Sequence, residues 1–95
     1  MSKRVLVPLA EGFEEIEAIT PIDVLRRAGV DVTVASVRGL SVKGSHGITV
    51  QAEMTLGDCA NMDFDLIVLP GGMPGAAHLA ESGMLCEMLK KHHEN

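Results

Sequence analysis

The stretch KRVLVPLAEGFEEIEAITPIDVLRRAGVDVTVASV, residues 3–37, decides the fold. Residues 3–9 are mostly apolar, which is typical of a strand buried on both faces, and we expect Pro8 at a strand end or an irregular point because proline has no N–H. Residues 14–28 have helical periodicity and are followed by a glycine, which suits the position after a helix. Residues 30–37 are rich in β-branched side chains and predict a second strand. This strand–helix–strand order predicts two parallel strands joined by a right-handed crossover.

The rest of the chain extends the α/β pattern. Residues 38–54 contain three glycines and alternating apolar side chains, which predict a hairpin or an excursion at the sheet edge. Residues 64–69 form an apolar run before a Gly-Gly turn and predict a third, central parallel strand, and residues 81–95 have helical spacing. A doubly wound sheet usually has about five or six strands. We therefore expect the sheet of residues 1–95 to be incomplete, either because the chain is a piece of a longer protein or because a partner chain completes the sheet.

Composition narrows the class of protein. A formal net charge of -5 offers no electrostatic basis for binding nucleic acid or an anionic membrane. The chain start resembles neither a secretion signal nor a membrane span, so we expect a cytoplasmic protein. Cys59 and Cys86 lack a C-x-x-C spacing and a nearby histidine at metal spacing, so we expect free thiols and no metal. The turn LAEGFEE, residues 9–15, has one glycine and several acids, which disfavours NAD, and no cofactor is expected.

Glu17 is the first candidate for a functional residue. On a helical wheel at about 100° per residue it falls between Val24 and Ala28, on the stripe that we expect to face the core. A carboxylate on that face must find donors, pair with a cation or hold its proton, and a held proton suits acid–base chemistry. The neighbouring acids have simpler explanations: Glu15 in a solvated helix start, Glu11 in the bend, and Glu14 in a frayed first turn that leaves its direction open.

Pro21 leaves an alternative open for this helix. It has no N–H to offer the carbonyl of Glu17 four residues earlier, so Glu17 would sit at a local irregularity. Alternatively, Thr20 caps a helix that starts at Pro21, and residues 14–19 are only a turn.

Gly71 and Gly72 are the second candidate. They follow the carboxyl end of a predicted buried strand, which is the edge where open α/β sheets bind ligands. Glycines allow close approach of the backbone, so their N–H groups could meet an oxyanion. An ordinary tight turn explains the pair equally well.

Two segments together resemble the amino-terminal half of the ThiJ/PfpI family, in particular its Parkinsonism-associated deglycase subgroup. They are residues 3–37, with the pattern E-E-x-E-x-x-x-x-x-D, and residues 64–82, FDLIVLPGGMPGAAHLAES. The resemblance implies a flavodoxin-like doubly wound sheet, a homodimer and a reactive cysteine on a strand-to-helix elbow. It gives Glu17 the place of a glutamate hydrogen-bonded to that thiol, and Gly71 and Gly72 the place of the nearby backbone turn.

The expected elbow cysteine lies beyond Asn95, and neither Cys59 nor Cys86 matches its position. We therefore expect this chain alone to be inactive and to need a complementary carboxyl-terminal fragment of the same protein. Ile16 and Ile19 lie on the otherwise polar side of the predicted helix, and with family dimers in mind we expect them in a twofold interface.

The resemblance leaves several functions open. The first is a cysteine-dependent glyoxalase or deglycase acting on small reactive carbonyls such as methylglyoxal, with Glu17 moving a proton. The second is a redox-sensing stress chaperone that uses the same cysteine. An amidase or peptidase would need a histidine beside that cysteine, and the four histidines are interpreted as structural: His46, His78, His92 and His93.

Overall fold

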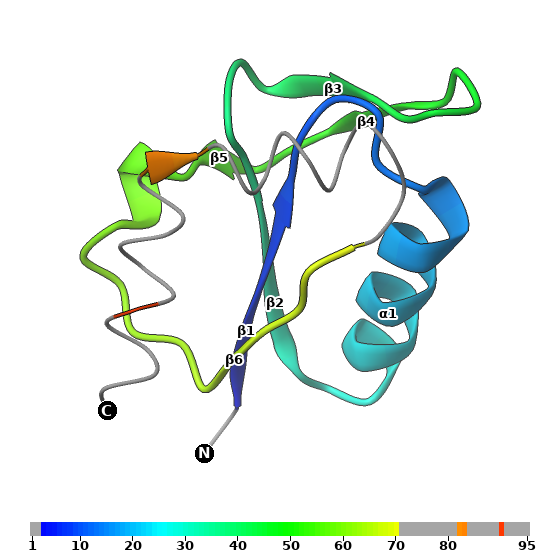
Figure 1. Cartoon of the computed structure of the whole chain (residues 1–95). Coiled ribbons are helices and arrows are strands. Elements are labelled where there is room, and N and C mark those ends of the chain that lie inside the picture. The colour runs from blue at the N-terminus through cyan, green and yellow to red at the C-terminus, as the bar shows by residue number, and fades with distance from the viewer. Residues whose placement is uncertain (1–2, 71–81, 84–89, 91–95) are drawn as a thin grey trace.

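The computed structural model describes residues 3–70, 82–83 and 90, and its elements follow the predicted order (Figure 1). The chain forms β1 (Arg4–Leu9), α1 (Glu15–Arg27), β2 (Asp31–Ser36), β3 (Ser41–Lys43), β4 (Thr49–Gln51), β5 (Met54–Thr55), the 3-10 helix η1 (Gly57–Cys59) and β6 (Leu66–Ile67). The candidate glycines Gly71 and Gly72, and most of the predicted helix at 81–95, lie outside the described residues.

Four strands form one parallel sheet in the order β5-β2-β1-β6. The pairing of β1 with β2 runs from Arg4 opposite Asp31 to Leu9 opposite Ser36. The prediction that the segments at 3–9, 30–37 and 64–69 are parallel neighbours is confirmed, and the architecture is a flavodoxin-like α/β sheet that is incomplete in this chain.

β6 differs from the buried central strand that its apolar run predicts. Its strand pairing covers only Leu66 and Ile67, and Leu66 is 50% exposed. Within the described part of the chain β6 is an edge strand, because the sheet order places no strand on its other side. The apolar composition is therefore not matched by burial here.

Pro8 lies inside β1, opposite Ala35, rather than at the strand end. The carbonyl groups of Arg4 and Leu6 accept hydrogen bonds from the N–H groups of Asp65 and Val68. The backbone N–H and C=O groups of the even-numbered residues of β1 therefore point towards β6. The last of these bonds joins the Val68 N–H to Leu6. The missing N–H of Pro8 therefore falls just past the described β1–β6 ladder, where it breaks no described bond.

α1 is one continuous helix that contains Pro21. Glu14 is its N-cap: Oε1 of Glu14 accepts the N–H groups of Ile16 at 2.6 Å and Glu17 at 3.2 Å. The alternative of a helix starting at Pro21 is therefore wrong. The helix tolerates the proline because its capped first turn and the buried side chains of Ala18 and Ile22 stabilise the segment on either side.

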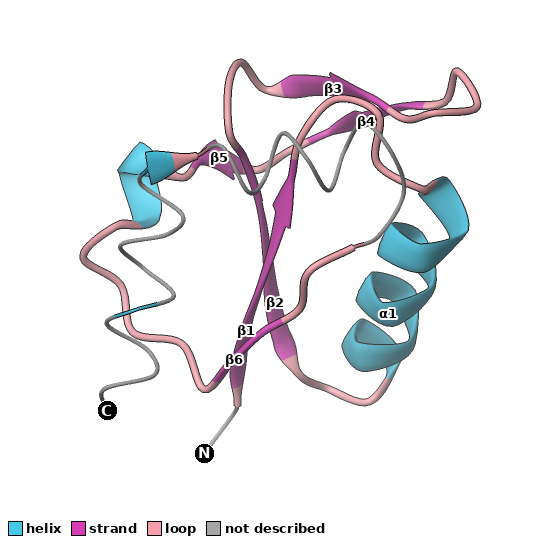
Figure 2. Cartoon of the chain, viewed as in Figure 1, coloured by secondary structure: helices cyan, strands magenta, loops and turns pink. Residues whose placement is uncertain are grey.

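The sheet is covered on both faces, with α1 on one side and η1 on the other (Figure 2). The larger core packs under α1 and the β3–β4 hairpin, and its buried members are Val5, Val7, Leu9, Phe13, Ala18, Ile22, Val32, Val34, Val42 and Ala52. The opposite core contains Leu6, Ala10, Ala35, Leu56 and Cys59. Alternate residues of β1 thus enter opposite cores, as expected for a strand buried on both faces.

The segment at 38–54 contains the predicted hairpin, in which β3 and β4 pair antiparallel from Ser41 opposite Gln51 to Lys43 opposite Thr49. Its turn closes where the Gly44 N–H donates to the Ile48 carbonyl at 2.8 Å. The Gly12 N–H donates to the Lys43 carbonyl at 2.9 Å, which joins the hairpin to the bend before α1.

Truncating the buried side chain of Leu6 tests this two-faced core. We expect Leu6→Ala to lower the free energy of unfolding by about 2–5 kcal/mol, because the side chain is fully buried and leaves a cavity. Urea denaturation measures the change. Leu40→Ala is the matched control at a 41% exposed position, and an equal loss in both variants would contradict the described core.

Candidate functional site

In the acidic bend, residues 11–17, the buried and exposed glutamates are the reverse of those that the helical wheel predicts. Glu15 is buried, with 5% of its surface exposed, whereas Glu17 is exposed. Both the core-facing prediction for Glu17 and the solvated one for Glu15 are wrong. The helix packs through Ala18 and Ile22, and Glu15 lies three residues before Ala18 on the same stripe. Val24, which the wheel placed beside Glu17, is 56% exposed.

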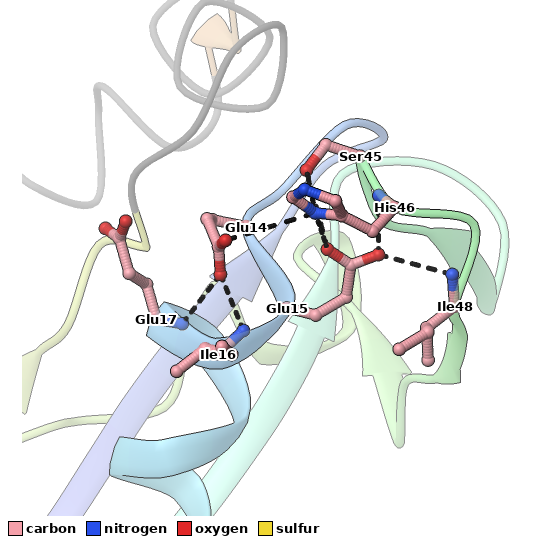
Figure 3. A network of polar contacts seen from close by, with 7 residues as sticks. All are labelled: Glu14, Glu15, Ile16, Glu17, Ser45, His46 and Ile48. Atoms are coloured by element: carbon pink, nitrogen blue, oxygen red, sulfur yellow. Dashed lines mark hydrogen bonds and ion pairs between the residues drawn. The ribbon is translucent and has the colours of Figure 1, made fainter.

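The Glu15 carboxylate is surrounded by donors from the tip of the β3–β4 hairpin (Figure 3). Its Oε2 accepts the backbone N–H groups of His46 at 2.7 Å and Ile48 at 3.2 Å. Its Oε1 lies 3.0 Å from Nδ1 of His46 and 3.4 Å from Oγ of Ser45. A carboxylate that would be costly to bury alone is thus satisfied by a segment about 30 residues later in the sequence.

Hydrogen bonding decides the ionisation of this carboxylate. Burial alone would raise the pKa of Glu15, but hydrogen bonds from the His46 side chain and from backbone N–H groups outweigh burial and lower the pKa to about 2. The hydrogen bond to Glu15 and its negative charge raise the pKa of His46 above the ordinary value, with a smaller contribution from the charge of Glu14. The pair therefore favours a carboxylate facing an imidazolium.

This cluster is not a catalytic triad. In a triad the nucleophile and the orienting carboxylate contact opposite ring nitrogens of the histidine. Here Oγ of Ser45, at 3.1 Å, and Oε1 of Glu15 both approach the same atom, Nδ1 of His46. The described geometry therefore does not support a serine hydrolase.

The predicted site residue Glu17 stands apart from this cluster. Its side chain points away from Glu15 and His46 (Figure 3), and its carboxylate contacts no partner among the described residues. The Glu17–Gly71 proximity predicted for a shared site involves a glycine that lies outside the described residues. The predicted interface residues Ile16 and Ile19 are exposed, at 72% and 39%.

A pocket of about 470 Å³ opens where β1 and β2 end, the edge at which open α/β sheets bind ligands. Leu9, Ala10 and Glu11 line it from β1 and the bend that follows, and Arg38 lines it from the segment after β2. Cys59 is buried in η1, and burial raises the pKa of its thiol, so it does not provide a ready thiolate. Within the described chain, no helix has the length and apolar character needed to cross a membrane.

The parallel sheet with α1 on one side and η1 on the other defines the class as a flavodoxin-like α/β protein. Residues 3–95 match the family model described as the DJ-1/PfpI family, and the chain belongs to this family. The resemblance expected from the bend and the glycine turn is confirmed.

Among curated relatives, the chain is 50% identical to Protein DJ-1 homolog B of Arabidopsis thaliana over 95% of its length, covering 21% of that protein. It is 40% identical to Glutathione-independent glyoxalase DJR-1.2 of Caenorhabditis elegans, over 94% of this chain and 47% of the relative. It is 38% identical to Deglycase TK1284 of Thermococcus kodakarensis, over 73% of this chain and 42% of that relative. The chain thus spans half or less of the length of these relatives.

Solved structures give the same result. The structure of Toxoplasma gondii DJ-1, oxidized, matches with a TM-score of 0.96 and 46% identity, covering 98% of this chain and 51% of that one. The structure of Drosophila melanogaster DJ-1beta matches with a TM-score of 0.96 and 42% identity, covering 99% of this chain and 51% of that one.

Acid titration tests the Glu15 network. Because the folded pKa of about 2 lies below the ordinary 4.5, the stability from this carboxylate is fully present above about pH 4.5 and is lost as the pH falls towards 2. We expect Glu15→Gln to be less stable near neutral pH and to show a weaker loss between pH 4.5 and 2. Thermal unfolding across that range measures it. Glu17→Gln, at an exposed position on the same turn, is the control, and identical profiles for both variants would contradict the network.

Proposed function

We propose that this chain supplies the amino-terminal half of a cysteine-dependent enzyme that acts on small reactive carbonyls such as methylglyoxal, as a glyoxalase or a deglycase. The observation that carries the proposal is the exposed Glu17 carboxylate on the first turn of the helix that follows β1, where it forms no hydrogen bond or ion pair with a described residue. Relatives named as a glyoxalase and a deglycase support the reaction class.

The complementary part would be a carboxyl-terminal segment of the same protein, so that residues 1–95 are half of one domain. The chain spans about half of the glyoxalase relative. Leu66 and Leu69 on and beside β6 are half exposed, which suits a strand edge that another segment covers. No cofactor is required, and a cytoplasmic location would keep the thiol reduced.

The proposed chemistry begins with a thiolate from that segment attacking the aldehyde carbon. A C–S bond forms, the carbonyl π bond breaks, and the resulting oxyanion takes a proton from the Glu17 carboxyl. The Glu17 carboxylate is then placed to accept a proton from the adduct. Gly71 and Gly72 would offer backbone N–H groups to the oxyanion. Because Glu17 is exposed here, the desolvation that keeps its proton would come from the completing segment.

A second candidate is a redox-sensing chaperone that uses the same cysteine. The observation that favours it is the relative whose structure is described as oxidized. Oxidation of the thiol to a sulfinate would place new oxygens beside Glu17, which could share its proton with them. A peroxide-dependent mass shift without carbonyl turnover would favour this function over the enzyme.

Removing Glu17 tests the proposed acid–base role. Residues 1–95 are co-expressed with the carboxyl-terminal segment, and the thiol is titrated by pH-dependent alkylation. We expect Glu17→Ala to raise the pKa of the thiol by about one to two units, because a hydrogen bond to a charged group contributes roughly 1.5–3 kcal/mol, and to reduce methylglyoxal turnover. Asp23→Asn, an exposed acid two turns later on α1, is the control. A folded Glu17→Ala protein with parental thiol pKa and turnover would show that Glu17 has no such role.

A homodimer through α1 is part of the proposal. Ile16 and Ile19 are exposed on α1, and an isologous contact would bring this face against its own copy. We expect Ile16→Glu to convert dimers into monomers in light scattering, because a charge would be buried at the centre of the contact. Leu40→Glu, an exposed leucine after β2, is the control. A dimer that survives Ile16→Glu would place the interface elsewhere.

A further inference from the structure

The tip of the β3–β4 hairpin and the start of α1 bring four metal-binding atoms together (Figure 3). Nδ1 of His46 lies 3.0 Å from Oε1 of Glu15, 4.0 Å from Oε2 of Glu14 and 3.1 Å from Oγ of Ser45. Oγ of Ser45 is 3.4 Å from Oε1 of Glu15. One ligand atom from each of Glu14, Glu15 and His46 lies within 4.8 Å of the others.

The two carboxylates are held in place by the backbone. Glu14 uses Oε1 to cap the N–H groups of Ile16 and Glu17, which leaves Oε2 towards His46. Glu15 uses Oε2 to accept the N–H groups of His46 and Ile48, and its Oε1 faces the imidazole. Each carboxylate therefore directs one oxygen to the same point with little freedom left to lose on binding an ion.

Gly44 makes room for this arrangement. A Cβ atom at position 44 would lie 2.5 Å from both Cδ and Oε2 of Glu15, closer than such atoms approach. Any other residue here would push the Glu15 carboxylate away from the donors that it accepts from His46 and Ile48. The backbone at Gly44 does not have a positive φ, so the space beside Glu15, and not the turn geometry, accounts for the glycine.

The donor set selects a class of ion. Mg²⁺ and Ca²⁺ prefer oxygen ligands throughout, whereas Zn²⁺ and its neighbours accept imidazole nitrogen with carboxylate oxygen. Bonds of about 2.1 Å in tetrahedral geometry place ligand atoms about 3.4 Å apart, close to the separations around Nδ1. The helix start contributes roughly half a positive charge, which two carboxylates outweigh.

We propose that Glu14, Glu15 and His46 form a binding site for a divalent transition-metal ion of the zinc class, with the Ser45 hydroxyl as a neighbouring oxygen. The ion takes the place of the proton at Nδ1 of His46, and that proton goes to water. This site is separate from the proposed thiol chemistry, because the Glu17 side chain points away from it. It also departs from the sequence-based expectation of no metal, which considered only cysteine and histidine spacing.

Calorimetric titration with ZnCl₂ tests the site in the chain co-expressed with its carboxyl-terminal segment. His78, His92 and His93 are first changed to alanine together, so that His46 is the one histidine of residues 1–95 that remains. We expect one Zn²⁺ per chain in this background and no measurable Mg²⁺ binding. We expect His46→Ala and Glu14→Gln each to weaken Zn²⁺ binding at least about tenfold, since changes to atoms that only support a metal ligand already cost that much.

A second measurement tests whether His46 coordinates the metal ion or only stabilises the fold. Cu²⁺ bound in the same background should show nitrogen hyperfine coupling from one imidazole in electron paramagnetic resonance, and His46→Ala should remove it. Glu14→Gln retains an oxygen that can cap the helix, and circular dichroism confirms its fold. Zn²⁺ binding that is absent in the background protein, or unchanged in His46→Ala, would overturn the proposal.

Discussion

The buried carboxylate of Glu15 is the interaction on which the amino-terminal edge of α1 depends. Taken from water without donors, an ionised carboxylate is strongly disfavoured. The structure resolves this with two backbone N–H groups, of His46 and Ile48, and one imidazole nitrogen, all from the hairpin tip. The position of the hairpin and the position of the helix start are therefore not independent. A change in the hairpin turn that withdrew these donors would leave a buried charge beneath the first turn of the helix.

The same constraint explains why the hairpin turn has a glycine at position 44. The carboxylate occupies the space under the turn, and a side chain at this position would displace it from its donors. The Gly12 N–H to Lys43 carbonyl bond adds a second tie between the bend and the hairpin, and the Ser45 N–H to Phe13 carbonyl bond adds a third. Phe13 is also buried in the larger core, so apolar packing fixes the residue whose carbonyl accepts this last hydrogen bond.

Much of the sheet could be predicted from sequence because it depends on local patterns. Apolar runs, a helical repeat and a terminal glycine define β1, α1 and β2. The short connection after Gly29 favours a right-handed crossover that places β2 parallel to β1. The extent of β6 could not be predicted in the same way. Residues 64–69 have the composition of a buried strand, but burial depends on what lies beside them, and in the described residues β6 is at the sheet edge.

The site was harder to predict, because its defining contacts join residues far apart in sequence. A helical wheel orders side chains around an axis but does not show how wide the packed arc is, and an arc drawn to include Val24 put Glu17 inside it. The packed positions are Ala18 and Ile22, and extending their spacing backwards reaches Glu15. That spacing was the available signal. The role of His46 had no such signal, since only the folded hairpin brings it to Glu15.

The exposed state of Glu17 follows from the same geometry and changes the reason for its proposed role. Buried by its own chain, Glu17 would already have its proton affinity set by the core. Glu17 is instead exposed on α1, and Leu66 and Leu69 of the neighbouring sheet are half exposed, so desolvation of its carboxyl would have to come from another segment that excludes water. The acid–base property would then belong to the assembled domain and not to either part. A half-domain without that cover would carry the glutamate on α1 with its carboxylate still in contact with water, without the dry surroundings that proton transfer to an oxyanion calls for.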